Sequence, residues 1–207
     1  MITKEEILIN LDKMIPNPVC ELAYNKDYEL LIATVLSAQS TDKRVNIVTE
    51  VLFKKYDIFS LVNADIKDIE NIIRSVGTYQ RKSTYIIAIA KSLIENYNGK
   101  VPNDREYLES LPGVGRKTTN LVLNEIYNVP AVAVDTHVSR VSKRLEIANE
   151  DDDVLAIENK IMKLFPEDKW GRLHKQLVLF GRYICKSSKP NCEECLFNKK
   201  CQYKRSN

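Results

Sequence analysis

The chain has 207 residues, of which 44% are hydrophobic and 29% are charged, and its net charge is +3. This balance excludes a disordered chain, and no apolar run reaches the length of a membrane-spanning helix. The length allows one large domain or two small ones with a real core. The first residues carry Glu5 and Glu6 where a secretory leader needs positive charge and then an apolar stretch, so we expect a cytoplasmic protein.

Positive charge is concentrated near the end of the chain. Between Gly171 and Asn207 the sequence holds nine Lys or Arg residues against two Glu residues. Such an excess suits a phosphate backbone, and a solvated basic tail would give the same count.

The predicted elements are all helical, because neither strand alternation nor an internal repeat competes with the helical periodicity. Thr3 and Glu6 form a capping box for a first helix, which Pro16 and Pro18 end. A second helix, from about Asp27 to Ala38, is apolar nearly all round, so we expect it at the centre of a domain.

The middle of the chain alternates helices with polar turns. Thr41 or Asp42 is predicted to cap the next helix. A helix near residues 66–76 is predicted to close with Gly77 as its C-cap. The loop Thr78–Lys82 then leads into a long helix, and its aromatic residue followed by two bases can face nucleic acid.

The second half of the chain also shows helix-capping signals. Asn103 with Glu106 predicts a cap for a short helix. Asp135 is predicted to be the N-cap of a later helix, and the acidic run Glu150–Asp153 to open another. The last long helix is expected near Trp170 to Ile184.

The stretch Leu111–Asn120, LPGVGRKTTN, combines a tight turn with an amine. Gly113 and Gly115 have no Cβ, so backbone N–H groups there can approach a bulky anion. Helical periodicity restarts at Arg116, which puts Lys117 in a first helical turn, where free N–H groups and the helix dipole favour phosphate. A glycine turn that only joins two helices would look the same.

A nucleotide-binding P-loop is excluded in this stretch. That motif needs glycine directly before lysine, a second glycine upstream and a strand in front. Here Arg116 separates Gly115 from Lys117, and the preceding segment is predicted to be helical.

Four of the five cysteines follow the pattern C-x6-C-x2-C-x5-C within 17 residues. Four thiolates so close together in a chain expected in the cytoplasm indicate a metal centre and not disulfides. Spacing alone leaves open a structural zinc ion, the more usual occupant, and an iron–sulfur cluster. Cys20 stands apart and is expected to be a buried thiol. The four candidate ligands are Cys185, Cys192, Cys195 and Cys201.

These motifs together resemble the endonuclease III family of helix-hairpin-helix DNA glycosylases. The resemblance lies in Leu36–Gln39, Leu111–Asn124, Val134–Val141 and Gly181–Cys201, which follow in the expected order and spacing. It implies an all-α, two-lobed fold with a [4Fe–4S] cluster in place of zinc, and a monomer that binds damaged double-stranded DNA in the cleft between its lobes.

The resemblance also implies the domain boundaries. Residues 22–130 would form a six-helix barrel that includes the helix-hairpin-helix at about 104–127. Residues 1–21 and 131–207 would form a second, discontinuous helical domain, with the cluster loop at 185–201.

The activity implied is base excision repair, with removal of oxidised pyrimidines and AP lyase cleavage 3′ to the abasic site. Lys117 would attack the sugar C1′ and form a Schiff base, which β-elimination then resolves. Asp135 would stabilise positive charge on the sugar and assist proton movement. Helix capping alone would explain Asp135 equally well.

The implied DNA contacts come from several segments. Gln39 would fill the space left by the extruded base. Thr78 stands where many relatives carry a wedge leucine, so either Tyr79 takes over that role or the wedge is weaker. Hairpin amides would hold a phosphate. The remaining implied contacts are Gly113, Val114, Gly115, Arg116, His137, Arg140, Lys186 and Lys189.

Two alternatives remain at this point. An adenine mismatch glycosylase of the same superfamily would share the hairpin, the aspartate and the cluster, but such enzymes usually lack a lysine at the position of Lys117 and carry a second domain. A non-catalytic DNA-binding or redox-sensing cluster protein would need no nucleophile.

Overall fold

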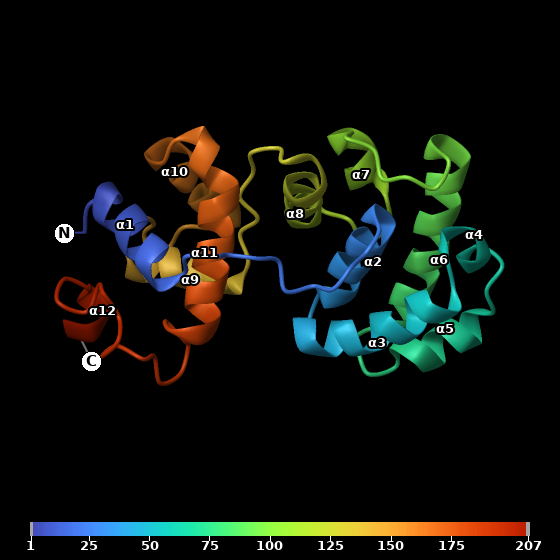
Figure 1. Cartoon of the computed structure of the whole chain (residues 1–207), viewed down its shortest axis with the longest axis horizontal. Coiled ribbons are helices and arrows are strands. Elements are labelled where there is room, and N and C mark those ends of the chain that lie inside the picture. The colour runs from blue at the N-terminus through green and yellow to red at the C-terminus, as the bar shows by residue number, and fades with distance from the viewer. Residues whose placement is uncertain (1, 206–207) are drawn as a thin grey trace. The chain divides into compact units, whose positions relative to one another are not determined.

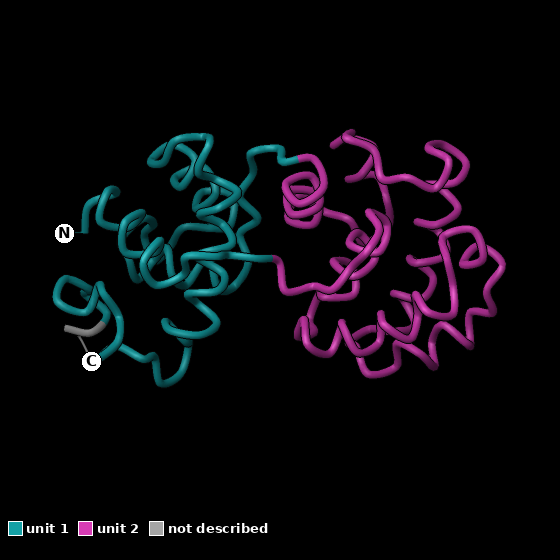
Figure 2. Tube along the Cα trace, in the orientation of Figure 1, with its two compact units in different colours: residues 1–19, 128–207 teal, residues 20–127 magenta. Residues whose placement is uncertain are grey.

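The computed structural model describes residues 2–205 and falls into two compact units (Figure 2). One unit, here called the inserted unit, is the continuous stretch Cys20–Tyr127. The other, the terminal unit, combines Met1–Val19 with Asn128–Asn207. All regular secondary structure in the described residues is helical, which confirms the predicted all-α fold. Within the same residues, no helix is both long and apolar enough to cross a lipid bilayer.

The inserted unit is built around α2, which the sequence makes apolar on nearly every side. Every residue from Tyr28 to Leu36 is buried, and α3, α6 and α8 pack against this helix (Figure 1). The helices of this unit are α2 (Asp27–Ser37), α3 (Asp42–Lys55), α4 (Ile58–Leu61), α5 (Ile66–Ile73), α6 (Tyr79–Tyr97), α7 (Arg105–Ser110) and α8 (Arg116–Tyr127).

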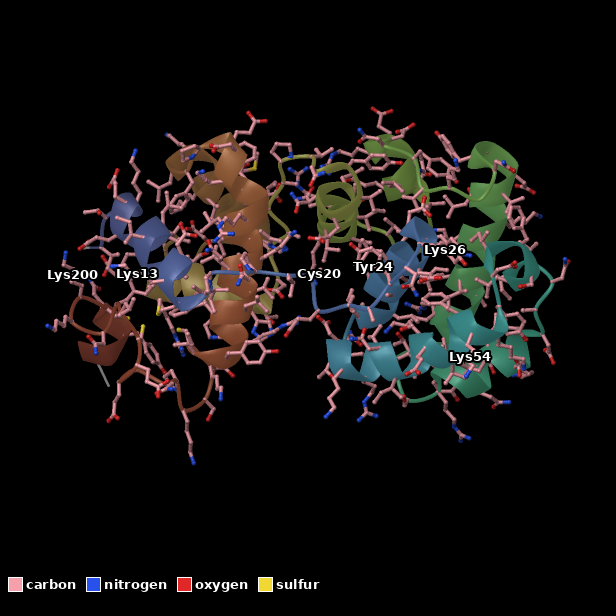
Figure 3. The ribbon with its side chains drawn as sticks, viewed as in Figure 1. Lys13, Cys20, Tyr24, Lys26, Lys54 and Lys200 are labelled. Atoms are coloured by element: carbon pink, nitrogen blue, oxygen red, sulfur yellow. The ribbon has the colours of Figure 1, made fainter. Side chains whose placement is uncertain are left out.

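The terminal unit has its own core, in which α11 packs against both α9 and α1. The Phe180 ring of α11 meets the Phe197 ring edge-on, with the ring centroids 5.7 Å apart. Lys200, which Figure 3 labels, lies before α12. Its ammonium donates to Glu6 of α1 at 2.5 Å. Its helices are α1 (Lys4–Met14), α9 (Thr136–Arg144), α10 (Val154–Leu164), the 3-10 helix η1 (Glu167–Lys169), α11 (Trp170–Tyr183) and α12 (Gln202–Arg205).

Several predicted helix starts are confirmed. Thr3 and Glu6 form the capping box of α1, Thr41 caps α3, and Asp153 caps α10. Each cap side chain accepts a hydrogen bond from a free amide of the first turn, which is the reason these residue types begin helices. Two of the nine basic residues counted near the C-terminus, Lys204 and Arg205, have side chains outside the described part.

The connection between α5 and α6 differs from the prediction. α5 ends at Ile73, and the left-handed residue is Thr78, with φ of 53°, so Gly77 is not a C-cap. The Gly77 amide donates instead to the Ser40 hydroxyl at 3.0 Å, a tertiary contact that local pattern cannot show. α6 begins at Tyr79, so the predicted loop Thr78–Lys82 is mostly its first turn.

Two smaller differences concern α4 and α7. Asp104, and not Asn103, caps α7, because its carboxylate accepts from the Tyr107 amide at 3.0 Å. The four-residue helix α4 was not predicted, since a single turn is too short for periodicity to reveal.

Candidate functional site

The predicted hairpin connects α7 to α8 in the inserted unit. Leu111 and Val114 are buried and anchor the turn to the core. The Val114 amide donates to the Leu111 carbonyl at 3.1 Å, so one of the three amides predicted to hold phosphate is already paired. Gly113 has φ of +77°, and a Cβ there would stand 2.6 Å from the Tyr85 ring. Both constraints require glycine at position 113.

Gly115 is a glycine that the fold itself does not require. Its φ lies outside the left-handed region, and a Cβ there would meet nothing within 4 Å. The Gly115 carbonyl accepts from the Thr119 amide at 3.0 Å, and Arg116 and Lys117 in the first turn of α8 are exposed. The turn therefore presents bare backbone and two cations at a helix N-terminus, which suits an approaching phosphate.

Gln39, predicted to fill the space left by the base, and Thr78, at the predicted wedge position, lie on adjacent loops. Both are exposed and left-handed, with φ of 59° and 53°. A Cβ on Gly77 would stand 3.7 Å from the Gln39 Cβ, so the two loops touch. Tyr79 is half-buried at the start of α6. Of the pair Thr78 and Tyr79, the threonine is therefore the more exposed.

Lys82 was predicted to face nucleic acid from a loop, and this prediction was wrong. It is 3% exposed, and its ammonium donates to the carbonyls of Leu36 at 2.9 Å and Ala38 at 2.5 Å. Burial lowers the pKa of its amine. The two carbonyls come from another helix, so nothing in the sequence around Lys82 signals them.

In the terminal unit, Asp135 is the N-cap of α9, as predicted. Its Oδ1 atom accepts from the amides of His137 and Val138, each at 2.8 Å. Capping thus uses one of the two carboxylate oxygens. Lys117 belongs to the inserted unit and Asp135 to the terminal unit, so the pairing of these two side chains stays a prediction.

Arg140, predicted to contact DNA, is engaged with groups of the terminal unit itself. Its guanidinium donates to the Gly181 carbonyl at 2.7 Å and to the Cys185 carbonyl at 3.0 and 3.1 Å, and lies 3.4 Å from His137 Nδ1. Burial lowers the pKa of His137. Arg140 therefore links α9 to the start of the cysteine loop, and its contact with DNA stays a prediction.

The four cysteines of the predicted metal centre line one pocket with apolar neighbours. Burial raises the pKa of Cys185 and raises that of Cys195 to about 11, so both thiols favour the protonated form until a cation replaces the proton. Arg144 donates to Cys185 Sγ at 3.4 Å and to the Lys186 carbonyl at 2.8 Å. Lys186 and Lys189 are exposed on the same loop.

The arrangement of these thiols bears on which group they hold. In the described part of the chain, no three Cys, His, Asp or Glu side chains are grouped as ligands of a single metal ion. The four cysteines instead surround a shared pocket. Four thiols around one pocket are a ligand set that a structural zinc ion or an iron–sulfur cluster could use.

Comparison with known proteins gives the class. The chain matches the HhH-GPD superfamily of base excision DNA repair proteins over residues 32–167. Endonuclease III of Bacillus subtilis is 44% identical over 199 residues, which cover 94% of this chain and 91% of that protein. Endonuclease III of Escherichia coli K12 is 40% identical over 200 residues, which cover 96% and 94%.

Solved structures of endonuclease III resemble this chain over its whole length. A non-covalent endonuclease III–DNA complex superimposes with a TM-score of 0.94 at 45% identity and covers 100% of this chain and 98% of that one. A trapped endonuclease III–DNA covalent intermediate superimposes with a TM-score of 0.93 at 45% identity and covers 100% of this chain and 99% of that one.

The fold and the superfamily match together define a helix-hairpin-helix DNA glycosylase. Within that class, the chain belongs to the endonuclease III family, as the resemblance in its motifs predicted. It is a base excision repair enzyme, a DNA glycosylase that also has AP lyase activity. This assignment is favoured over an adenine mismatch glycosylase and over a non-catalytic cluster protein.

Proposed function

We propose that the chain excises damaged bases from double-stranded DNA with Lys117 as the nucleophile and Asp135 as the carboxylate that assists it. The observation that carries this proposal is the start of α8, where Lys117 is exposed two residues after a glycine that the fold does not require. A strand whose phosphate contacts Gly115 would bring a neighbouring sugar within reach of the amine.

The chemistry follows from an amine attacking a sugar. The unprotonated Lys117 amine bonds to C1′ while the glycosidic bond breaks, and the base leaves with the electron pair and takes up a proton. The amine loses a proton and the sugar ring opens to give an imine. A proton then leaves C2′ and the bond from C3′ to the phosphate oxygen breaks, which cuts the strand 3′ to the site. Water finally hydrolyses the imine and frees Lys117.

Asp135 has two tasks in this proposal. One carboxylate oxygen caps α9, as the bonds to the His137 and Val138 amides show. The carboxylate also stabilises the positive charge that develops on the sugar and accepts or returns protons during the elimination.

The duplex is held without reading its sequence. Backbone at Gly113 and Gly115, together with Arg116, would contact a phosphate, and Lys186 and Lys189 would add charge along the strand. Such contacts position the DNA and leave the choice of base to the pocket.

Extraction of the base is assigned to Gln39 and Thr78. Leaving the stack costs a few kcal/mol, and less for a damaged base. Gln39 would fill the space that remains. Thr78 is a shorter wedge than leucine, so we propose that this enzyme depends more on lesions that already weaken stacking, with oxidised pyrimidines as its substrates.

Cys185, Cys192, Cys195 and Cys201 would hold a [4Fe–4S] cluster. The four thiols around one pocket, flanked by Arg144, suit a group that needs several thiolates. Such a cluster would cross-link the loop that carries Lys186 and Lys189 through these four side chains. We further propose that the enzyme acts as a monomer in the cytoplasm, on the DNA of the nucleoid.

Borohydride reduction tests the imine. Borohydride with abasic duplex DNA should convert the imine into a stable protein–DNA adduct visible on a denaturing gel. Lys117→Gln should abolish the adduct. Lys91→Gln changes an exposed lysine of α6 in the same way and should leave it intact. An adduct that survives Lys117→Gln, or no adduct with the unmodified enzyme, would overturn the proposal.

A further inference from the structure

One side chain joins the two loops that are proposed to enter the DNA. Lys82 lies in the first turn of α6, where its amide donates to the Thr78 carbonyl at 3.1 Å. Its ammonium reaches the end of α2 and donates to Leu36 at 2.9 Å and Ala38 at 2.5 Å. α2 and α6 pack against each other (Figure 1). Lys82 thus connects the residue before Gln39 to the turn after Thr78.

The end of α2 explains why a cation lies there. The last carbonyls of a helix have no partners within the helix, and the helix dipole makes this end negative. Lys82 supplies donors and a positive charge while only 3% exposed. Burial lowers the pKa of its amine, so the site bears a desolvation cost that an apolar residue would avoid. The ammonium must therefore do more than fill space in the core.

Two further contacts join the same loops. The Gly77 amide donates to Ser40 Oγ at 3.0 Å, and Arg44 donates to the Ser75 carbonyl at 3.4 Å. The Arg44 contact is exposed and the Gly77 contact is partly buried, whereas the bond from Lys82 to the Leu36 carbonyl is buried. The buried ammonium is thus the inner member of a set of three contacts between the loops.

Left-handed backbone at two exposed residues also requires support. Gln39 and Thr78 both adopt φ values that non-glycine residues rarely take. Such conformations persist where the surrounding structure over-determines them. The Lys82 ammonium binds the carbonyl of Ala38, directly before Gln39, and the Lys82 amide binds the carbonyl of Thr78 itself. Lys82 therefore restrains the backbone at both strained positions.

We propose that Lys82 is a positioning residue for base extrusion, because its ammonium fixes Gln39 and Thr78 relative to each other so that both enter the DNA together. This inference rests on the proposed function, in which these two residues enter the stack. Lys82 does not contact the DNA itself. Its effect falls on the step that removes the base from the helix and not on the chemistry of Lys117.

The test compares a substrate that needs extrusion with one that does not. Lys82→Met keeps the apolar stem and removes the donors. Single-turnover excision of an oxidised pyrimidine from duplex DNA should slow about tenfold or more. Borohydride trapping on a single-stranded abasic oligonucleotide, which has no base to extrude, should stay within about twofold. In the Lys117→Gln background, 2-aminopurine beside the lesion should brighten less on binding when Lys82→Met is added.

Controls separate positioning from folding. Lys91→Met, on an exposed part of α6, should leave both substrates unaffected. Lys82→Gln retains an amide N–H₂ donor group without the charge, should show the same split with a smaller loss, and carries the test if Lys82→Met does not fold. Equal losses on both substrates, or unchanged excision of the lesion, would overturn the positioning role. No adduct with the unmodified enzyme would instead overturn the proposed function.

Discussion

Gly181 packs directly against His137, because a Cβ on Gly181 would stand 2.9 Å from the His137 Cβ and 3.2 Å from Val141 Cγ2. The missing side chain lets α11 approach α9 closely. Since Asp135 caps α9, this contact also sets the place of the proposed catalytic carboxylate.

Gly181→Ala should therefore destabilise the terminal unit. The added methyl group meets a Cβ at backbone level, and relief requires the two helices to separate, at a cost of about 1–3 kcal/mol. Urea denaturation measures the change. Equal stability would show that α9 and α11 can move apart freely.

The two hairpin glycines should respond in opposite ways. Gly113→Ala should lower stability by about 1–2 kcal/mol, because position 113 is left-handed and crowded by Tyr85. Gly115→Ala should leave stability within about 0.5 kcal/mol and weaken binding to every DNA sequence alike. Fluorescence anisotropy with several duplexes measures the second effect. A change confined to particular sequences would contradict a contact through phosphate.

Substitutions of Asp135 can separate capping from catalysis. Asp135→Ala should cost about 1 kcal/mol of stability, since two amides lose their acceptor, whereas Asp135→Asn retains a good cap. Both variants should lose excision activity by about a hundredfold or more, because both lack the charge. Full activity of Asp135→Asn would contradict a catalytic role and show that Asp135 serves only as the cap of α9.

His137 should make stability depend on pH. Burial, followed by the positive charges of Arg182 and Arg140, lowers its pKa in the folded chain, against an opposing effect of Asp135. The unfolded chain then binds more protons between the folded pKa and about 6.5, so stability rises with pH across that window and is fully gained above it. Urea titrations from about pH 5 to 8 should show a smaller rise for His137→Gln. An unchanged slope would contradict a lowered pKa of His137 in the folded chain.

The cysteine pocket predicts the metal content. The purified protein should be brown and carry about four irons and four labile sulfides per chain. Cys195→Ser should lower the iron content and the thermal stability together, since the loop loses a ligand. A colourless protein that contains zinc would contradict the proposed cluster.

Much of the fold follows from local signals. The caps at Thr3 and Asp135 could be predicted, because a short polar side chain bonds amides two or three residues ahead. The buried place of α2 followed from its apolar composition. The cap of α7 moved by one residue to Asp104, since neighbouring polar residues compete and tertiary contacts decide between them.

The parts that could not be predicted depend on partners from distant segments. Lys82 lies in a polar stretch, and its burial depends on carbonyls more than forty positions earlier in the chain. The bonds from Arg140 to the carbonyls of Gly181 and Cys185 were not predicted either, because these groups reach it only once α9 and α11 have packed. The hairpin and the cysteine spacing pointed to the site, whereas the groups that support it became visible only in three dimensions.

The terminal unit is assembled from both ends of the chain, and this affects folding during translation. The inserted unit is complete once Tyr127 has left the ribosome, whereas α1 packs against α11. At about 5–20 residues per second, the 80 residues from Asn128 onward take on the order of ten seconds. Until α11 has been synthesised, Leu11 and Ile7 lack the core that it completes, so the nascent chain exposes the apolar face of α1 during that interval.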